Sequence, residues 1–222
     1  MEQSKVNEML AWASQKKLDA VGKKLEARGF KVIACADRTA ARSALMKLLA
    51  APEHQTIGFG GSMSVGVLEV EPELAAAGKT LLNHGNPSLS FEEKMAVMRA
   101  QLTCDVFVAS TNALTEDGIL VNIDGNGNRV AAMIFGPKQV VLVVGRNKLV
   151  PDVHAGLERI AQLAGPVNAY RLNRKTPCAT TGSCGHCSGA CPESICRMTT
   201  IVKQPSANTP TTILLVNDDL GL

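Results

Sequence analysis

Residues 105–148 read DVFVASTNALTEDGILVNIDGNGNRVAAMIFGPKQVVLVVGRNK, and this stretch decides the fold that we expect for the chain. Apolar runs at residues 106–109, 119–123 and 140–144 have the length and the branched side chains of short buried strands. The polar elbows TNALTEDG and GRNK follow the first and the last of these runs. Ligands of open α/β sheets bind beyond strand ends. We therefore expect a layered sheet with a binding site at these elbows.

Residues 119–135 are expected to form a hairpin, because two apolar runs flank the loop sequence DGNGN. In that loop Gly125 and Gly127 can adopt positive φ, and the Asn side chains can bond their own backbone. Gly136 and Pro137 then end the second strand. Such residues form turns in any protein, so a single elbow does not define a binding site. Two polar elbows around the same hairpin favour a binding site.

The remaining sequence alternates between helical and strand patterns. Helices are expected at residues 4–28, 39–49, 88–102 and 151–164, and strands at residues 31–35, 56–59, 79–82 and 211–216. Residues 167–175 fit either a short helix or an irregular connection. The alternation predicts one α/β domain over residues 1–222, a mostly parallel layered sheet with helices on both faces. A Cys-rich loop at residues 176–197 lies near its C-terminal end.

Composition excludes several classes of function. The chain has 222 residues, of which 45% are hydrophobic but only 3% aromatic, so it can bury a sizeable core yet offers few platforms for stacking nucleic-acid bases. The net charge of +3 comes from interspersed residues and predicts no polyanion partner. No stretch has the apolar length of a membrane span, and MEQSKVNEML lacks a signal peptide's apolar core. We expect a cytoplasmic protein.

A glycine-rich turn follows the expected strand at residues 56–59. The sequence GFGGSMS, then VGVLE, has the layout of a strand, a tight turn and a helix start, where free N–H groups can hold an anion. It matches neither the dinucleotide fingerprint nor the P-loop, so a tight turn without a ligand remains the alternative. The candidate anion-binding residues are Gly60, Gly61, Ser62 and Ser64. His84, at another strand end, could bind substrate or move protons, or be a solvated loop residue.

Five of the seven cysteines lie in the sequence CATTGSCGHCSGACPESIC, which begins at Cys178. The two-residue gap between Cys184 and Cys187 lets both thiolates face one ion, which suits zinc or an iron–sulfur cluster. His186, between them, is a candidate zinc ligand that we expect to point away. The Cys-Pro pair at Cys191 is typical of iron–sulfur runs, although the other gaps do not match ferredoxin spacing. The alternative is a set of thiols, reduced or partly oxidised, without metal, and any one of the five can be the spare.

Three motifs resemble those of the LUD-domain (lactate utilisation, YkgG-type) family. They are GFGGSMS at residues 58–64, the long motif at residues 111–150, and PCATTGSC at residues 177–184, followed by GHC and ICR. The resemblance covers nearly the whole chain. It implies a NagB/RpiA/CoA-transferase-like α/β fold and a role in bacterial oxidation of lactate to pyruvate, as a subunit beside iron–sulfur redox partners. The family's cysteine pattern falls on Cys178, Cys184, Cys187 and Cys196, which leaves Cys191 as the departure.

Folds of this kind bind sugar phosphates, CoA or similar anions at strand ends, so the resemblance supports one cleft that joins the glycine turn to the elbow at residues 116–118. Positive charge for a carboxylate or phosphate ligand would come from Arg129, Arg146 and Lys148. The acid/base candidates are Glu116, Asp117 and Asp124. Asn112 and Asn126 are further candidate ligand contacts.

Three functions are compatible with these observations. The leading hypothesis is a redox-associated subunit that binds a small hydroxy or keto acid and works in a complex with a metal centre. The second is a stand-alone isomerase or acyl/CoA-transfer enzyme with Glu116 as base or nucleophile. The third is a non-catalytic ligand-binding or assembly module whose metal is structural. A homo-oligomer is compatible with each of them.

Overall fold

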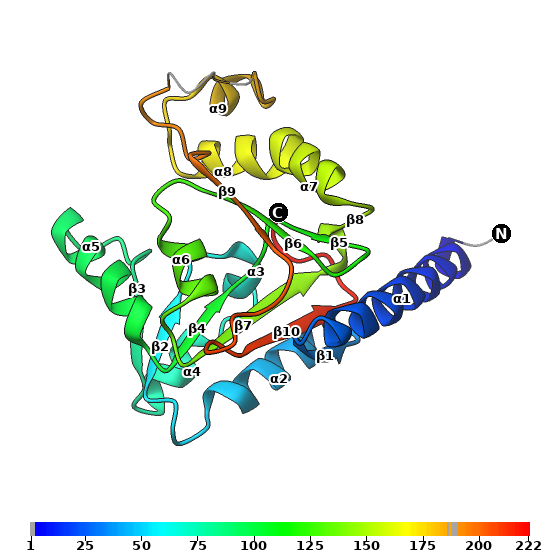
Figure 1. The fold of residues 1–222 in the computed structure, drawn as a ribbon, viewed down its shortest axis with the longest axis horizontal. Helices are drawn as coiled ribbons and strands as arrows, with labels where there is room; N and C mark the ends of the chain where they lie inside the picture. Colours follow the sequence, from blue (N-terminus) through cyan, green and yellow to red (C-terminus); the bar gives the residue numbers. More distant parts are fainter. Residues whose placement is uncertain (1–2, 186, 188–190) are drawn as a thin grey trace.

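The computed structural model describes residues 3–185, 187 and 191–222, and it is an α/β fold with two sheets (Figure 1). Six strands form a parallel sheet in the order β1-β10-β7-β4-β2-β3, and four short strands form a second sheet in the order β8-β5-β6-β9. The predicted α/β class, with a mostly parallel sheet and helices on both faces, is therefore confirmed. No helix among these residues is both long and apolar enough to cross a membrane.

The strands of the main sheet are short. They are β1 (Lys31–Cys35), β2 (Thr56–Phe59), β3 (Thr80–Asn83), β4 (Val106–Ala109), β7 (Gln139–Gly145) and β10 (Thr211–Val216). Those of the second sheet are β5 (Ala113–Thr115), β6 (Leu120–Asp124), β8 (Leu149–Val150) and β9 (Met198–Val202).

Helices precede or follow most strands. They are α1 (Gln3–Ala27), α2 (Arg38–Leu49), α3 (Met63–Gly66), α4 (Glu71–Ala76), α5 (Phe91–Ala100), α6 (Asn128–Ile134), α7 (Val153–Arg159), α8 (Gly165–Arg171) and α9 (Pro177–Thr181). Three single turns, η1 (Gln101–Thr103), η2 (Arg146–Lys148) and the π-helical η3 (Ile160–Ala164), complete the set.

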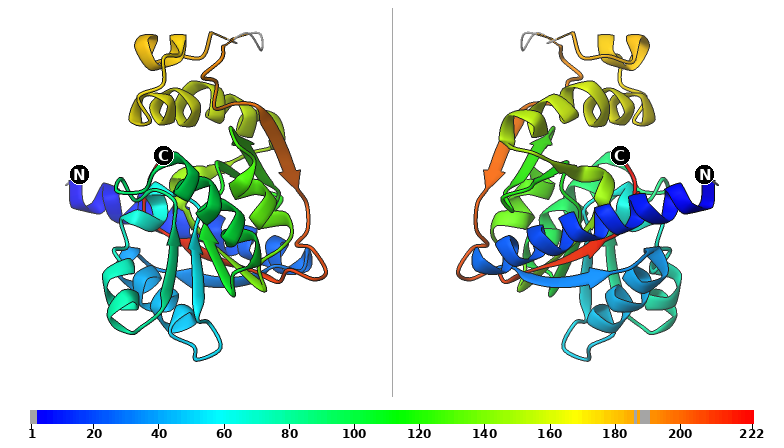
Figure 2. Two further views of the ribbon diagram at one scale, coloured as in Figure 1. Left: turned by 90° about the vertical axis from the view of Figure 1, so that its left-hand side faces the viewer. Right: turned by 90° about the vertical axis from the view of Figure 1, so that its right-hand side faces the viewer.

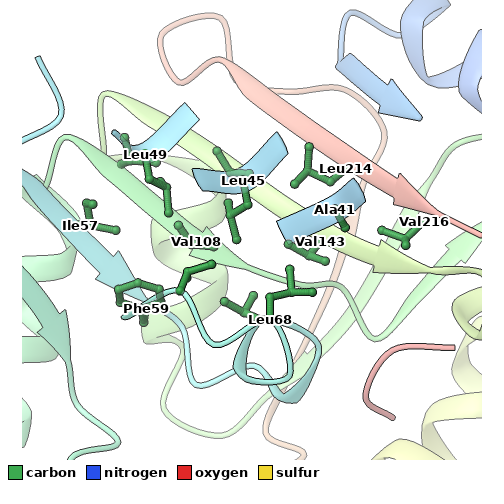
Figure 3. Close-up of a cluster of buried hydrophobic side chains, with 14 of the residues drawn as sticks. Ala41, Leu45, Leu49, Ile57, Phe59, Leu68, Val108, Val143, Leu214 and Val216 are labelled. Atoms are coloured by element: carbon green, nitrogen blue, oxygen red, sulfur yellow. The ribbon is translucent and has the colours of Figure 1, made fainter. Parts of the chain in front are cut away.

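Both faces of the main sheet are covered by apolar cores. Successive side chains of each strand point in opposite directions, and both sets are apolar. In β7, Val141 and Val143 join a core beneath α2, whereas Val140, Leu142 and Val144 join a second core beneath α1. Figure 3 shows the first of these cores, in which the buried face of α2 covers the sheet. Each fully buried aliphatic side chain of this kind contributes roughly 1.5–3 kcal/mol to folding.

Helix starts follow the capping residues in the sequence, with one correction. Asp37 caps α2 as predicted, because its carboxylate accepts a hydrogen bond of 2.8 Å from Ala40 N. The prediction that Ser88 caps the next long helix is wrong. Ser88 is held in a local turn by the side chain of Asn86, and Ser90 caps α5 through a reciprocal capping box with Glu93.

The predicted hairpin over residues 119–135 is wrong, because residues after the DGNGN loop form helix α6. Gly127 takes the left-handed conformation with φ of +81°, and Asp124 accepts a hydrogen bond from its N–H, so the chain turns directly into a helix. Val130 and Met133, three residues apart, then bury one helical face. The real hairpin pairs β5 with β6 across residues 116–119.

The helix that begins after Asp152 does not end at Gly165 and Pro166 as predicted. The chain continues from α7 through η3 into α8, so residues 167–171 are helical as well. A proline in a helix interior removes one backbone donor and crowds the preceding turn. The wider π-helical turn directly before Pro166 accommodates both effects.

The helices α7, α8 and α9 lie beyond the carboxyl ends of the main strands, next to the second sheet, as the views in Figures 1 and 2 agree. Strand β9, which the sequence did not predict, pairs antiparallel with β6 and returns the chain from the Cys-rich segment (residues 176–197) toward β10. Residues 192–197 at the end of this segment thereby lie near the carboxyl ends of the main strands.

Candidate functional site

A cavity of about 610 Å³ lies at the carboxyl ends of the parallel strands. One wall consists of the turns that follow β2, β3 and β4, represented by Gly60, His84 and Ser110. The opposite wall consists of α8 and residues 192–197. Open α/β sheets bind their ligands at this edge. We call this space the basic cavity.

Positive side chains outnumber negative ones on the walls of the basic cavity. The cations are Lys94, Arg129, Lys148, Arg171, Arg174 and Arg197, and the anions are Asp124 and Glu193. Within the described part of the chain, the side chains of Lys94 and Arg174 have neither a hydrogen bond nor an ion pair. Cations without partners in a concave site favour an anionic ligand.

Arg129 lies in the floor of the basic cavity, and its guanidinium contacts other residues of the protein. Its two terminal nitrogens donate to the side-chain oxygens of Asn122 and Asn112 and to the carbonyl oxygens of Ser110 and Ile123, at 2.7–3.0 Å. Its Nε lies 3.2 Å from a carboxylate oxygen of Asp124. These contacts occupy the whole guanidinium, so Arg129 fixes the elbow residues and neutralises Asp124.

Lys148 is an unusual cavity residue because it is a lysine that is only 5% exposed. Its Nζ donates to the backbone oxygen of Leu222 at 2.5 Å. Burial, together with the positive charges of Arg159 and Arg129, lowers the pKa of Lys148 to about 7.

His84 presents a hydrogen-bond donor to the basic cavity. Gln101 Nε2 donates to the carbonyl oxygens of Phe59 and Leu82, which fixes the orientation of the amide, and the same nitrogen lies 3.1 Å from His84 Nδ1. His84 Nδ1 therefore accepts, and the proton of the neutral ring sits on Nε2, beside Gly61. Burial lowers the pKa of His84, so the ring stays neutral near pH 7.

The predicted glycine turn lies in the wall of the basic cavity, which Gly60, Gly61, Ser62 and Ser64 all line. Ser62 takes the cap position of α3, but its side chain makes no capping bond. Ser64 is buried and donates to the carbonyl oxygen of Leu220 at 2.8 Å, so its hydroxyl is bound within the protein. Asn112 and Asn126 also line the basic cavity, and Asn112 is tied to Arg129.

The single predicted cleft is divided into two cavities. Glu116 and Arg146 line a separate cavity of about 350 Å³ near α1, away from the glycine turn. Arg146 donates to the Asp219 carboxylate at 2.9 Å. Asp117 is 56% exposed and faces Arg28 at 3.9 Å, lining neither cavity. Of the three acid/base candidates, only Asp124 lines the basic cavity. There its carboxylate forms an ion pair with Arg129.

Among the described cysteines, Cys196 lines the basic cavity. Partial burial and the nearby thiols of Cys178, Cys184 and Cys187 raise the pKa of Cys196 to about 11, whereas the Cys191 thiol faces the Lys175 carbonyl oxygen at 4.0 Å. The described cysteines are free thiols and therefore suit a metal centre in donor type. No group of three or more described Cys, His, Asp or Glu residues has metal-ligand geometry. His186 lies outside the described residues.

The family follows from the comparison with known proteins. The LUD domain model matches residues 18–216, so the chain belongs to the LUD-domain family, which is associated with lactate utilisation in general. Its structure is similar to that of a DUF162 family protein from Deinococcus radiodurans, with a TM-score of 0.50 and 14% identity over 91% of this chain and 98% of that chain. That likeness shows the fold alone.

A second solved structure, eIF2B beta from Chaetomium thermophilum, matches with a TM-score of 0.29 and 17% identity over 61% of this chain and 43% of that chain. No curated protein sequence matches the chain.

Several cavity residues have no counterpart in the sequence predictions. Arg171 and Arg174 come from the sequence RLNRK, whose two arginines would have been a signal had that segment been recognised as helical. Lys94, on the edge of α5, resembles any solvated lysine in the sequence. Gln101 does not line the basic cavity but contacts His84, and nothing in its local sequence indicated this role, because the role depends on carbonyl groups from two other strands.

Proposed function

We propose that the protein is a subunit of a lactate-oxidising redox system and that it binds a small hydroxy or keto acid in the basic cavity. The observation that carries this proposal is the excess of positive side chains around a cavity that Cys196 also lines. Lys148 and the neutral His84 ring stand on the sheet wall, and Arg171 and Arg174 stand opposite. This arrangement suits a ligand with a carboxylate at one end and an oxygen substituent next to it.

We further propose that Cys178, Cys184, Cys187 and Cys196 supply the four ligands of an iron–sulfur cluster or zinc, with Cys191 as a possible alternate. A cluster bound there would supply one-electron transfer, whereas zinc would only stabilise the fold of the Cys-rich segment. The residues of this chain have separate tasks. Arg129 holds the elbows in place, His84 Nε2–H donates to the ligand, and Arg171 and Arg174 neutralise its carboxylate.

Two measurements test this proposal. Protein purified without oxygen is analysed for iron, acid-labile sulfide and zinc, and ligand binding is measured by calorimetry with L-lactate and pyruvate against ribose 5-phosphate and CoA. We expect iron with sulfide, and binding of the two small acids. Zinc without redox activity would favour the non-catalytic module. Turnover of a phosphosugar or acyl-CoA by the isolated chain, lost in Glu116→Gln, would favour the stand-alone enzyme.

The smaller cavity offers less support for that stand-alone enzyme. Glu116 lines it together with Lys17 and Arg146, but Arg146 is already bound to Asp219. Lys17 is thus the one cation of this cavity without a side-chain partner in the described residues, whereas Lys94 and Arg174 lie in the other cavity, with the glycine turn. An anionic substrate bound there would be remote from Glu116.

A further inference from the structure

Strand β9 leaves one edge of the second sheet open. Among the described strands it pairs with β6 alone and stands at the end of the order β8-β5-β6-β9. Figure 2 shows it at the outer side of the molecule. Thr199 and Ile201 of this strand are exposed, Ile201 to 45%. An open edge of this kind can pair with an extended segment of another chain.

The hydrogen bonds of β6 show which of its backbone groups face β9. Ile123 N–H donates to the side chain of Asn112, which directly precedes β5, so the backbone of Ile123 turns towards β5. The carbonyl oxygen of Asp124, the next residue, accepts a hydrogen bond from Arg197 N on the opposite side. Neighbouring residues of a strand bond in opposite directions. Asn122 and Asp124 therefore turn their backbone towards β9.

The register then identifies the backbone groups of β9 that point outward. Thr200 and Met198 are the partners of the two β6 residues that face β9, so their backbone bonds inward. Thr199 and Ile201 alternate with them and turn their N–H and C=O groups away from the sheet. Within the described part of the chain these four groups have no partner. They form a short template for one more strand.

Strand β9 also lacks the features that protect an edge strand from pairing. Its sequence, MTTIV, contains no charged residue and no proline. Both ends are basic, because Arg197 precedes the strand and Lys203 follows it, and no acidic residue occurs at positions 194–217. Lys203 is exposed and has no hydrogen bond or ion pair with the described residues. The edge is therefore a neutral, β-branched segment between two cations.

We propose that β9 is the docking edge for an extended segment of a partner protein, with β-branched or apolar residues in its centre and acidic residues at both ends. The backbone groups of Thr199 and Ile201 would add this segment to the second sheet, and its acidic ends would face Arg197 and Lys203. A second copy of the chain fits less well. Antiparallel pairing of two β9 strands over their full length would place each Arg197 opposite a Lys203, and like charges in that position repel.

The position of β9 brings such a partner next to the Cys-rich segment. Met198, the first residue of the strand, comes two residues after Cys196. A protein docked at this edge would therefore stand beside the thiols that we propose as metal ligands. That the partner is a redox subunit rests on the proposed function. The docking edge itself does not, because it requires neither the ligand nor the metal.

The experiment is amide hydrogen exchange of the full chain, followed by NMR. The probe is a synthetic peptide with valine and threonine alternating in its centre and a pair of acidic residues at each end. Without peptide, the amides of Thr199 and Ile201 should exchange much faster than that of Thr200, which bonds to β6. Saturating peptide should slow both of the fast amides by at least about tenfold, because strand addition places them in hydrogen bonds.

Variants and altered peptides separate backbone pairing from attraction between charges. Thr199→Pro removes one outward N–H, which an edge strand tolerates, and should abolish the protection of Ile201 by the peptide. Thr199→Val keeps that N–H and should bind the peptide as the wild type does. A peptide N-methylated on the residues that face β9 should not protect wild-type protein, and this control remains decisive if Thr199→Pro does not fold. A peptide with lysines at its ends should bind at least about tenfold more weakly at low salt.

The outcomes separate this inference from the proposed function. If the acidic peptide does not bind, or binds without protecting Thr199 and Ile201, the docking edge is wrong, whereas the proposed ligand and metal are unaffected. Protection that grows with protein concentration in the absence of peptide would show that a second copy pairs here, and would overturn the proposed partner. Equal binding of the lysine-ended peptide would overturn its acidic character. Failure of L-lactate to bind would instead contradict the proposed function and leave the docking edge intact.

Discussion

The two walls of the basic cavity belong to regions that are stabilised in different ways. The main sheet has an apolar core on each face, and the apolar side chains of each strand point alternately into one core and the other. The region above it has a short second sheet, a small apolar cluster and a network of buried polar side chains. Five buried side-chain atoms have no partner in the described residues, and three of them, on Gln101, Asn122 and Arg159, belong to residues bonded to cavity-lining groups.

This contrast separates the residues that stabilise the fold from those that serve the ligand. Buried polar atoms without partners are destabilising, so a fold tolerates them where a ligand or a reaction requires polar groups. Variants in the main sheet should therefore change stability and leave binding intact, whereas variants in the cavity wall should do the reverse. Arg129 belongs to both classes, because it is buried and also fixes the cavity floor.

Arg129→Met should produce the largest effect. It leaves the buried Asp124 carboxylate without its partner and removes the donor from four oxygen acceptors, so the free energy of unfolding should fall by about 3–5 kcal/mol. Urea unfolding with an unchanged m-value measures this loss. The double variant Arg129→Met/Asp124→Asn should recover part of the stability but not ligand binding. Equal losses in both variants would show that the ion pair is not what Arg129 contributes.

Leu45→Ala should reduce stability by about 3 kcal/mol, because Leu45 is fully buried in the core beneath α2. Urea unfolding gives the loss, and calorimetry at a temperature where the variant is folded gives the affinity for L-lactate. The affinity should equal that of the wild type. A weakened affinity in this variant would mean that the two regions are not independent.

Asp105→Asn should cost roughly 1–3 kcal/mol, since the Asp105 carboxylate accepts bonds from Gln55 N, Thr56 N and Thr56 Oγ1 and pairs with Lys138 at 2.7 Å. The Lys138 ammonium and the Thr56 N–H hold the pKa of Asp105 well below its usual value.

A folded pKa below the unfolded one gives stability that is fully present above the unfolded value, about 3.9, and that is lost progressively as pH falls from there to the folded pKa. The difference in unfolding free energy between wild type and Asp105→Asn should therefore have its maximum value at pH 7 and should decrease below about pH 4. A difference that is constant down to pH 3 would rule out the charged carboxylate as its source.

Lys94→Glu should produce the smallest effect, a loss of L-lactate affinity of up to about fivefold, because contributions from partly exposed charges are about 0.2–1 kcal/mol. Arg99→Glu is the matched control, as Arg99 lies on the same helix but does not line the basic cavity. Calorimetry at low salt compares the two. Equal losses would indicate a general effect of net charge.

The same contrast explains which parts of the structure could be predicted from the sequence. Strands such as β7 and β10 are nearly continuous apolar runs, so their local sequence pattern was sufficient to predict them as buried strands. The helix α6 was mistaken for a strand because the apolar run at residues 130–135 also carries a three-residue spacing of buried positions. Strand β9 was missed because its residues are largely exposed and its pairing depends on β6, more than seventy residues earlier in the chain.

The site was predictable only in part. The turns at Gly60 and Ser110 lie at strand ends, where general rules of open sheets place ligands. The opposite wall comes from α8 and residues 192–197, and a sequence alone does not show that these segments fold back over the sheet. For the same reason Glu116 and Arg146 were grouped with the glycine turn, although they line another cavity.

The most direct test of the basic cavity is the affinity of L-lactate for the charge-reversed wall. Arg171→Glu/Arg174→Glu alters only α8 and the residues after it, and Lys203→Glu, on the exposed chain between β9 and β10, is its control. Since charge-assisted hydrogen bonds contribute about 1.5–3 kcal/mol each, calorimetry should show at least about a tenfold rise in Kd for the double variant and none for the control. Equal Kd values in all three proteins would contradict a carboxylate site in the basic cavity.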